Sequence, residues 1–514
     1  MNSLMRRAAA VVLLLGYYTA EAQTSTTTTT AATTSASSTT CATVLTPSYS
    51  PPVVAKGWKA QLIATGLTRP RSMKFDSNGG LLVVEQGVGV SRLTFADDGG
   101  TCMSVNGNTT VLVDRELFHG LELSEDGRTL YVSTEEEVRS HSYDPDAASV
   151  SSQQQRLVSN MTNPGRGHVT RTLLLSRKVP GLLLVSRGSA ANLDDLAAQQ
   201  SSGISQIRAY NISNATDTAY NYPTDGLLIG WGLRNSVGVA EHPLTGGIWS
   251  VENSADDISR LGRDIHEDNP GEELNFHGFL NDTSALGANY GYPSCFALWN
   301  TTDFPSLNDL TVGSQFSLDS NATLNDTTCA QRSVSPRLTF RAHMAPLDIK
   351  FQPSNASRAF VSFHGSWNRD HPAGYKLSYV EFNPDTGEPV EQSDSVSAAH
   401  DVLTSPDLSA CRPDGGCLRP AGLAFDSSGE RLFVSSDATG EIWVVMRSGE
   451  DEDGGATTTG TETRTGTGGA VTSTSSAAAA AALGAWNRGM GGEGLLMVAV
   501  TVLMAAVGGL TFAG

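Results

Sequence analysis

Short apolar runs, broken by Gly/Asp turns and alternating with polar residues, recur along the chain. The clearest copies read SMKFDSNGGLLVVEQ from Ser72, GLELSEDGRTLYVST from Gly120 and GLAFDSSGERLFVSSD from Gly422. Looser copies read TLLLSRKVPGLLLVS from Thr172, SVGVAEHPLTGGIWSVE from Ser236 and LDIKFQPSNASRAFVSF from Leu347. Such alternation around a turn is typical of a β-hairpin. Six hairpins spaced by about 50 residues or more predict an all-β, six-bladed β-propeller, with a two-sheet sandwich as the alternative.

The longest interval separates the fourth copy from the fifth. Residues 256–341 hold an acidic segment, two cysteines and four glycosylation sequons. We therefore expect this interval to leave the blades as an excursion. Long excursions on a rigid scaffold commonly build a binding face.

Positively charged and polar side chains come just before or at the start of every predicted hairpin. They are Arg69, Arg71, His119, His168, Arg234, Asn235, His343 and Arg419. The strand starts of a propeller converge on its central channel, so these side chains should gather around one axis. Guanidinium groups bind carboxylates in a bidentate way, which predicts a site for an anionic ligand. The alternative is that nearby carboxylates pair with them structurally.

The stretch 231–293 carries the strongest signal for such a site. Arg234 and Asn235 are adjacent, and a short extended run at 247–251 ends in the sequence ENSA. An irregular strand end frees backbone carbonyls, which calcium accepts as ligands. The stretch therefore predicts a polar, anionic ligand with a hard cation beside it.

The acidic segment that follows has two further interpretations. Its carboxylates are Asp256, Asp257, Asp264, Glu267, Asp268, Glu272 and Glu273. Their spacing does not match an EF-hand loop. They form either a solvated loop or a separate structural calcium site, and one of them is a candidate structural partner of Arg234.

The two ends of the 514-residue chain differ in composition from its middle. Residues 1–22 have two arginines, an apolar run and an Ala-Glu-Ala cleavage site, which predicts a signal peptide. Residues 23–40 and 448–486 are low-complexity linkers that cannot bury a core. Residues 487–514 end in an uncharged apolar tail, typical of a glycosylphosphatidylinositol (GPI) attachment signal, with a tail anchor as the alternative. The propeller should span 41–447.

Sequons and cysteines support export to the cell surface or cell wall. The nine sequon asparagines are Asn108, Asn160, Asn211, Asn214, Asn281, Asn300, Asn321, Asn325 and Asn355. The six cysteines fit an oxidising compartment, and proximity in sequence suggests the pairs Cys41–Cys102, Cys295–Cys329 and Cys411–Cys417 among the fifteen possible pairings. A net charge of −19 argues against nucleic acid as a partner.

At these positions the chain resembles a known family. The matching stretches are GRGHVTRTLLLS, LLVSRGSAANLD, WGLRNSVGVAEHP, WSVENSADD, DNPGEELNFHG, GANYGYP, RAHMAPLDIKF, FHGSWNR, GYKLSYVEF and LRPAGLAFD. They resemble the soluble quinoprotein glucose/sorbosone dehydrogenases, and most closely the fungal pyranose dehydrogenases that depend on pyrroloquinoline quinone (PQQ). The resemblance implies PQQ and Ca²⁺ at the channel mouth and oxidation of an aldose or related sugar at its anomeric carbon. Electrons would pass to an external acceptor: a quinone, a cytochrome or a copper oxygenase.

The resemblance also assigns roles to individual residues. His168 matches the catalytic base, Arg234 and Asn235 match a cofactor-binding pair, and Arg419 matches a carboxylate-binding arginine. A hydrogen-bonded strand histidine is the competing interpretation of His168. The carbonyls of Ser254 and Ala255 stand where bacterial relatives bind calcium through a Gly-Pro pair.

The chain departs from the bacterial pattern at its cofactor cations. Cys417 replaces a second arginine, and the loop HGSWNR at 364–369 lacks the bacterial lysine. Arg71, His364 and Arg369 are the candidates that supply the missing charge.

Four other residues are candidates for roles at the mouth. Trp367 could form a wall against the cofactor or sugar, with a buried core position as the alternative. His119 and Asn192 are candidate substrate contacts, and His343 is either near the channel or fixes a turn.

Two other functions remain open at this point. A lactonase-like propeller hydrolase would need Asn, Asp and Glu at the channel, where this chain offers Arg and His. A non-enzymatic propeller that binds carbohydrate or protein is favoured by the departures from the cofactor pattern.

Overall fold

The computed structural model describes residues 41–449. The predicted signal peptide (1–22), the first linker (23–40), the second linker beyond 449 and the tail (487–514) lie outside the described residues. Within 41–449, no helix is long and apolar enough to cross a membrane.

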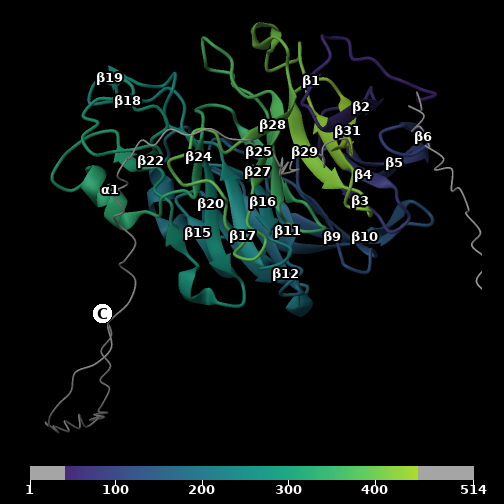
Figure 1. The fold of residues 1–514 in the computed structure, drawn as a ribbon. Coiled ribbons are helices and arrows are strands. Elements are labelled where there is room, and N and C mark those ends of the chain that lie inside the picture. Colours follow the sequence, from purple (N-terminus) through teal and green to yellow (C-terminus); the bar gives the residue numbers. More distant parts are fainter. Residues whose placement is uncertain (1–40, 450–514) are drawn as a thin grey trace, which may run out of the picture. The chain divides into compact units, whose positions relative to one another are not determined.

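Six antiparallel sheets form the blades of a β-propeller (Figure 1). Blade 1 holds β3 (Pro70–Phe75), β4 (Leu81–Glu85), β5 (Gly89–Asp97) and β6 (Met103–Val113). Blade 2 holds β7 (Leu121–Leu123), β8 (Thr129–Ser133), β9 (Val138–Asp144) and β10 (Ser149–Ser159), with β14 (Tyr220–Asn221) added in parallel. Blade 3 holds β11 (Leu173–Leu175), β12 (Leu182–Arg187), β13 (Gln206–Asn211) and β15 (Leu227–Trp231), with β21 (Ala288–Asn289) added in parallel.

The remaining blades follow the same order along the chain. Blade 4 holds β16 (Ser236–Glu241), β17 (Gly247–Glu252), β20 (Glu272–Phe279) and β24 (Leu338–Phe340). Blade 5 holds β25 (Pro346–Phe351), β26 (Arg358–Phe363), β27 (Lys376–Glu381), β28 (His400–Thr404) and the edge strand β1 (Val53–Val54). Blade 6 holds β29 (Pro420–Phe425), β30 (Leu432–Ser436), β31 (Glu441–Arg447) and β2 (Trp58–Ala64).

The six predicted hairpins are confirmed as the first two strands of the six blades. Their innermost strands, β3, β7, β11, β16, β25 and β29, contact one another in turn around a ring. The predicted propeller is therefore confirmed.

The N-terminal strand β2 closes the ring. It pairs antiparallel with β31, with Trp58 opposite Arg447 and Leu62 opposite Trp443. Blade 6 thus joins the two ends of the described chain, and β2 covers the edge that β31 would otherwise expose.

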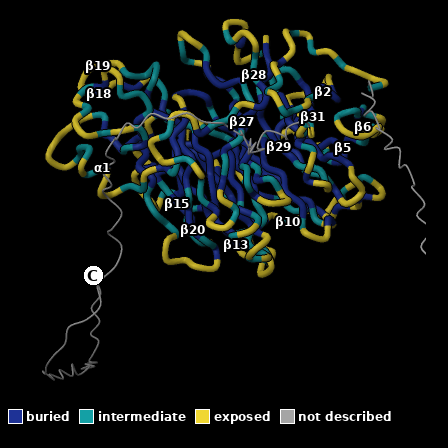
Figure 2. Tube along the Cα trace, in the orientation of Figure 1, coloured by how far each residue is buried: buried dark blue, intermediate teal, exposed yellow. Residues whose placement is uncertain are grey.

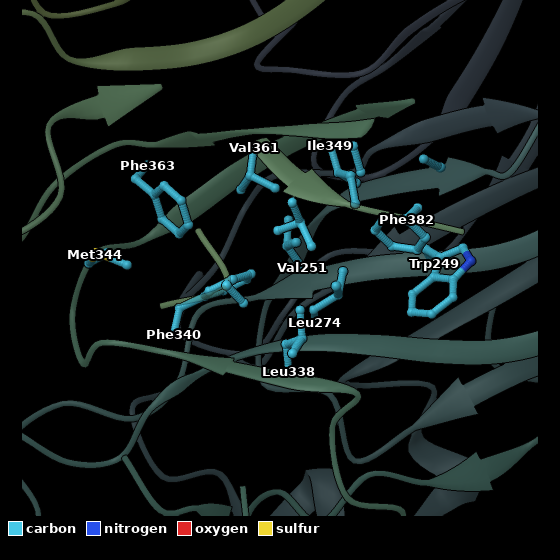
Figure 3. Close-up of a cluster of buried hydrophobic side chains, with 14 of the residues drawn as sticks. Trp249, Val251, Leu274, Leu338, Phe340, Met344, Ile349, Val361, Phe363 and Phe382 are labelled. Carbon is cyan, nitrogen blue, oxygen red and sulfur yellow. The ribbon is translucent and has the colours of Figure 1, made fainter. Parts of the chain in front are cut away.

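Apolar side chains pack between each pair of neighbouring blades, and one buried cluster lies at each of the six interfaces. Figure 3 shows the cluster between blades 4 and 5, where Trp249 and Leu274 meet Ile349, Phe363 and Phe382. The strands are buried while the connecting loops are exposed (Figure 2). Neighbouring blades stack face to face because each blade has apolar side chains on both faces of its sheet.

The prediction that residues 256–341 leave the blades is wrong in part. Strands β20 and β24 from this interval are the third and fourth strands of blade 4. The pattern was hidden because β20 begins with two glutamates, Glu272 and Glu273, that are buried rather than solvated.

The rest of this interval forms a satellite beside blade 4. It contains β18 (Ser259–Arg260), β19 (Arg263–Asp264), β22 (Cys295–Ala297), β23 (Gln315–Ser317) and the short helix α1 (Asp326–Arg332). A separate apolar cluster fills it, with Phe296, Phe304 and Phe316 at its centre. Short 3-10 helices occur at Asp195–Ala198, Gln200–Ser202, Ile212–Asn214, Thr283–Ala285 and Leu408–Ala410.

All three predicted disulfides are confirmed. Cys41–Cys102, Cys295–Cys329 and Cys411–Cys417 are bonded, and no cysteine within the described range is free. The first attaches the N-terminal segment to blade 1, the second braces the satellite, and the third closes a short loop before β29.

Candidate functional site

Two sets of strand ends meet at one edge of the ring. Within each hairpin the start of the first strand lies opposite the end of the second: Ser236 opposite Glu252, and Pro420 opposite Ser436. Residues that follow a hairpin therefore reach the same mouth as residues that precede it. Two groups of predicted site residues, defined by their contacts, lie at this mouth.

The first group surrounds Asp437, which follows β30. One carboxylate oxygen pairs with Nη1 of Arg71 at 2.7 Å, and the other contacts Nε2 of His364 at 2.8 Å. The Nε of Arg71 donates to Nδ1 of His119 at 3.3 Å. The structure therefore brings Arg71, His119 and His364 together, as predicted, around a carboxylate that the sequence analysis missed.

Electrostatics set the protonation states in this group. Burial alone would raise the pKa of Asp437, but His364, Arg71 and Arg419 hold that pKa far below its ordinary value. Burial lowers the pKa of His364 to about 4, against the opposing effect of Asp437. At neutral pH, Arg71 is therefore the counter-ion of Asp437, while His364 is a neutral hydrogen-bond partner.

Arg419 is positioned differently from Arg71. Its Nη1 donates to the carbonyl of Pro413 at 2.5 Å, inside the loop closed by Cys411–Cys417. Its Nε is buried without a partner, and within 41–449 no carboxylate pairs with it. This guanidinium therefore keeps its charge available for an anion.

The second group surrounds Arg234 at the start of β16. Its Nη2 pairs with Asp256 at 2.9 Å and also donates to Oδ1 of Asn192 at 2.9 Å. Nε and Nη1 donate to the carbonyls of Asn192 and Asn253 at 3.1 and 3.3 Å. Arg234 thus forms an ion pair with the acidic segment, which was the alternative interpretation considered above.

The side chain of Asn192, predicted as a substrate contact, is instead engaged in hydrogen bonds within the protein. Besides accepting from Arg234, its Oδ1 accepts from the Asp256 N–H at 2.8 Å, and its Nδ2 donates to the Asp256 carbonyl at 2.6 Å. Its side chain thus clamps Asp256 and Arg234 together.

His343 completes this ion-pair network. Its Nδ1 lies 3.4 Å from Asp256, and its Nε2 lies 2.5 Å from the carbonyl of His266. Burial lowers the His343 pKa, but the bond to Asp256 and the charge of Glu272 outweigh burial and raise it. Asp256 is therefore held between Arg234 and His343, and His343 fixes the turn before β25.

His168 precedes β11 and keeps some exposed surface although protein atoms surround it densely. Its Nδ1 contacts the carbonyl and the hydroxyl of Ser189 at 3.1 and 3.0 Å, whereas its Nε2 has no hydrogen-bond partner in the described chain. Burial first, and then the charge of Arg234, lower its pKa to about 3. His168 is thus a neutral imidazole with an unoccupied lone pair, as a general base requires.

Gly188 brings His168 next to the Arg234-Asn235 pair. A Cβ at residue 188 would lie 2.6 Å from Oδ1 of Asn235 and 2.8 Å from Cβ of His168. Only glycine permits this approach. Asn235 is buried, yet its side-chain amide bonds to no other described residue, so it remains available to a ligand at the base.

The backbone after β17 fits the predicted cation position. Among residues 41–449, no group donates a hydrogen bond to the carbonyl of Ser254 or Ala255. The Ser254 N–H donates to Glu272 at 2.8 Å, which holds this irregular segment in place. No cluster of three or more His, Cys, Asp or Glu side chains is arranged for a metal in the described range, so a metal here would depend on backbone oxygens.

Two predicted cofactor residues have other surroundings. The Nη2 of Arg369 lies 3.2 Å from both Glu267 and Asp268, so its charge is already neutralised. Trp367 is 61 % exposed, which excludes the core position considered for it and leaves its ring free beside the mouth.

The acidic segment is neither a wholly solvated loop nor a metal cluster. Asp256, Asp264, Glu267 and Asp268 pair with arginines or nearby histidines, whereas Asp257 is exposed and has no ion pair among the described residues. Glu272 and Glu273 are buried in β20, and burial raises the pKa of each to about 7.

Seven of the nine sequon asparagines are exposed, and the other two, Asn300 and Asn325, are half-buried. Asn325 also caps α1 by accepting from the Thr328 N–H.

The mouth residues that sequence reasoning missed share one signal. Asp437 and Glu252 each stand at the end of the second strand of a hairpin, in the runs VSSD and WSVE. The search for channel-facing side chains above covered the positions before each hairpin, and it gave no role to the carboxylates at the hairpin ends. The antiparallel pairing of each hairpin places both kinds of residue at one edge.

The fold and the site together define a β-propeller whose polar mouth holds arginines and a neutral histidine with a free ring nitrogen. Residues 52–448 match the model of the TrAA12-like family, and the chain belongs to this family.

Three relatives illustrate the similarity. The "Pyrroloquinoline quinone-dependent sugar dehydrogenase" of Hypocrea jecorina is 53% identical over 79% of this chain and 92% of its own length. The "Calcium structure of Trichoderma reesei Carbohydrate-Active Enzymes Family AA12" superposes with a TM-score of 0.76 at 53% identity, covering 80% of this chain and 100% of that one. The "Holo form of Pyranose Dehydrogenase PQQ domain from Coprinopsis cinerea" superposes with a TM-score of 0.74 at 34% identity, covering 79% of this chain and 99% of that one. The predicted family is therefore confirmed.

Proposed function

We propose that this protein is a PQQ- and Ca²⁺-dependent dehydrogenase that oxidises an aldose, pyranose or related sugar at C1. Two of the relatives named above are a sugar dehydrogenase and a pyranose dehydrogenase, which supports a sugar substrate. The observation that carries the proposal is the position of His168, whose Nε2 is free, beside the Arg234-Asn235 pair: His168 Cβ, Asn235 Oδ1 and the Arg234 carbonyl all lie close around Gly188.

The residues present fit an anionic cofactor. Arg419 has a buried Nε without a partner in the described chain, and the Asn235 amide is unengaged. Arg71 and Arg234 are already paired with Asp437 and Asp256, so they would add hydrogen bonds more than net charge. The unengaged carbonyls of Ser254 and Ala255 would hold the calcium.

In this proposal, PQQ held by Arg419 and Asn235 would supply the hydride acceptor, and Ca²⁺ on the Ser254 and Ala255 carbonyls would supply a Lewis acid. His168 takes the proton of the sugar C1 hydroxyl at Nε2. Arg234, held in place by Asp256 and Asn192, offers N–H donors beside the reacting groups. The exposed ring of Trp367 supplies an apolar face for the sugar.

Reconstitution separates this function from its rivals. The purified protein is incubated with PQQ and CaCl₂, and aldoses are screened for reduction of an artificial dye. Sugar-dependent dye reduction that requires both additions supports the proposal. Lactone hydrolysis without PQQ would indicate a hydrolase, and saturable sugar binding without turnover would indicate a binding propeller.

We also propose that the protein is exported and held at the cell surface by a GPI anchor, with electrons leaving to a separate protein or small quinone. The signal peptide, the linkers and the C-terminal tail of the sequence support this. Release from intact cells by phosphatidylinositol-specific phospholipase C tests the anchor, and protein that stays on the cells after complete digestion would contradict it.

A further inference from the structure

The hydrogen bonds around His168 identify which ring nitrogen carries the proton. The Ser189 carbonyl, 3.1 Å from Nδ1, can only accept a hydrogen bond. The Ser189 hydroxyl, 3.0 Å from Nδ1, donates its own proton to the Ala191 carbonyl at 2.7 Å and therefore also accepts. Both neighbours are acceptors, so Nδ1 carries the hydrogen and Nε2 keeps its lone pair.

A buried amide fixes the two segments that make this contact. Asn163 is 2 % exposed, and its Nδ2 lies 3.0, 3.1 and 3.2 Å from the carbonyls of His168, Gly188 and Ser189. Its Oδ1 accepts from Nε of Arg187 at 2.9 Å, which orients the amide so that its two hydrogens face the three carbonyls.

Two arginines complete the clamp. Nη1 of Arg171 donates to the His168 carbonyl at 2.8 Å, and Arg187 donates to the carbonyl of Thr162 at 3.0 Å. Both side chains are buried, so this polar network is closed to water. A buried network with its groups satisfied holds a single arrangement.

The same segment is joined to the cofactor-binding pair. The N–H of Ser189 donates to the carbonyl of Arg234 at 2.8 Å, and the N–H of His168 donates to the carbonyl of Ser189 at 2.9 Å. A shift of Ser189 would therefore move His168 relative to Arg234. Within the described chain no carboxylate bonds to the His168 ring, so neutral acceptors alone set its tautomer.

We propose that Ser189 and Asn163 are positioning residues for His168. Ser189 holds the Nδ1–H tautomer, and Asn163 fixes the ring and the 188–189 segment so that Nε2 points to the substrate. This rests on the proposed function, in which Nε2 is the proton acceptor.

The test measures the tautomer and the turnover separately. Wild type, Ser189→Ala and Asn163→Ala are labelled with ¹⁵N-histidine and reconstituted with PQQ and Ca²⁺. In wild type we expect the His168 signals of a protonated Nδ1 and an unprotonated Nε2. Both variants should show a mixture of tautomers, with less change in Ser189→Ala because the Ser189 carbonyl remains.

Turnover should follow the tautomer. We expect kcat to fall about tenfold in Ser189→Ala and roughly a hundredfold in Asn163→Ala, with KM and PQQ affinity within about twofold of wild type. The matched control is Ser362→Ala, another fully buried serine whose hydroxyl donates to a backbone carbonyl, that of Ala421 at 2.7 Å. It should lose similar stability but keep the His168 tautomer and kcat.

The outcomes distinguish this role from the proposed function. A wild-type protein that binds PQQ but oxidises no sugar overturns the proposed function. An active wild type with a protonated Nε2, or a folded Ser189→Ala that keeps both tautomer and kcat, overturns the positioning role alone. If Asn163→Ala does not fold, the Ser189→Ala measurements still decide.

Discussion

Two carboxylates, Asp437 and Asp256, each neutralise an arginine at the mouth and contact a histidine. Asp437 pairs with Arg71 and contacts His364, and Asp256 pairs with Arg234 and His343. Buried cations are costly without such partners. The mouth is therefore not uniformly basic: its free recognition groups are those that these carboxylates leave unpaired.

Replacing the proposed base tests its role directly. In His168→Gln we expect kcat to fall by about 10² to 10⁴-fold, because the amide cannot accept the hydroxyl proton. PQQ binding, measured by equilibrium titration, should stay close to wild type, since the arginines are unchanged. Full turnover in this variant would contradict the assignment.

The pH–rate profile gives a second test of the same residue. Burial holds the pKa of His168 near 3, below its ordinary value of 6.5, so the ring becomes protonated and inactive only as the pH falls through about 3. We expect kcat/KM to show no histidine limb between pH 7 and about 4, over the range in which the protein stays folded. An acid limb centred near 6.5 would show that His168 is solvated or is not the base.

At the scale of the element, each blade begins with a hairpin whose strands are short and buried and whose ends are polar. The core positions specify the hairpin, and the two polar ends are brought to one edge by its antiparallel register. Strand β20 shows how this pattern can be masked, since Glu273 lies opposite Glu252 in the β17–β20 ladder. Both carboxyls are buried, and burial raises the pKa of each. The charge of Glu273 raises the pKa of Glu252 further, and the charge of Glu272 raises that of Glu273.

The buried carboxyl of Glu273 makes the stability of the fold depend on pH. The pKa of Glu273 is raised from 4.5 to about 7. Between these two pH values the folded state therefore keeps a proton that the unfolded state has lost. The contribution of the protonated group is complete below pH 4.5 and is lost as the pH rises through about 7. As the pH rises from 4 to 8, the free energy of unfolding of Glu273→Gln should therefore increase by about 1–3 kcal/mol relative to that of wild type.

Denaturant unfolding at pH 4, 6 and 8 measures this gain. The control is Glu430→Gln, which changes an exposed glutamate in a turn of blade 6 and should show no comparable pH dependence. An equal effect of Glu273→Gln at all three pH values would contradict the raised pKa.

At the scale of the whole molecule, the ring is closed by hydrogen bonds between β2 and β31, near the two ends of the described chain. Every blade packs on two neighbours through a buried apolar cluster, including the pair joined by this closure. Opening blade 6 would therefore expose apolar surface on both adjoining blades.

A cavity in the closing strand should weaken the whole ring. Leu62 in β2 is 1 % exposed and packs in the cluster between blades 5 and 6, so Leu62→Ala should cost about 2–5 kcal/mol. We expect one cooperative transition at a lower Tm in calorimetry, with Lys59→Ala on the exposed side of the same strand as the matched control. Two separate transitions would show that blade 6 unfolds alone.

The sequence by itself determined the repeated part of this protein. Alternation around Gly/Asp turns predicted all six hairpins, because strand periodicity and turn chemistry are local properties. The positions before each hairpin located His168, Arg234 and Arg419, and proximity along the chain predicted the three disulfides.

Only the tertiary structure decided which of these groups are paired and which are free. The capture of Arg369 by Glu267 and Asp268, and the clamp of Asn163 on His168 and Ser189, join residues whose contact no local pattern encodes. The placement of β20 and β24 in blade 4 likewise depended on burial of two glutamates, against their usual preference for water. Hydrogen bonding and desolvation depend on neighbours distant in sequence. The pairing and protonation of the mouth residues therefore follow from the tertiary structure and not from any local sequence pattern.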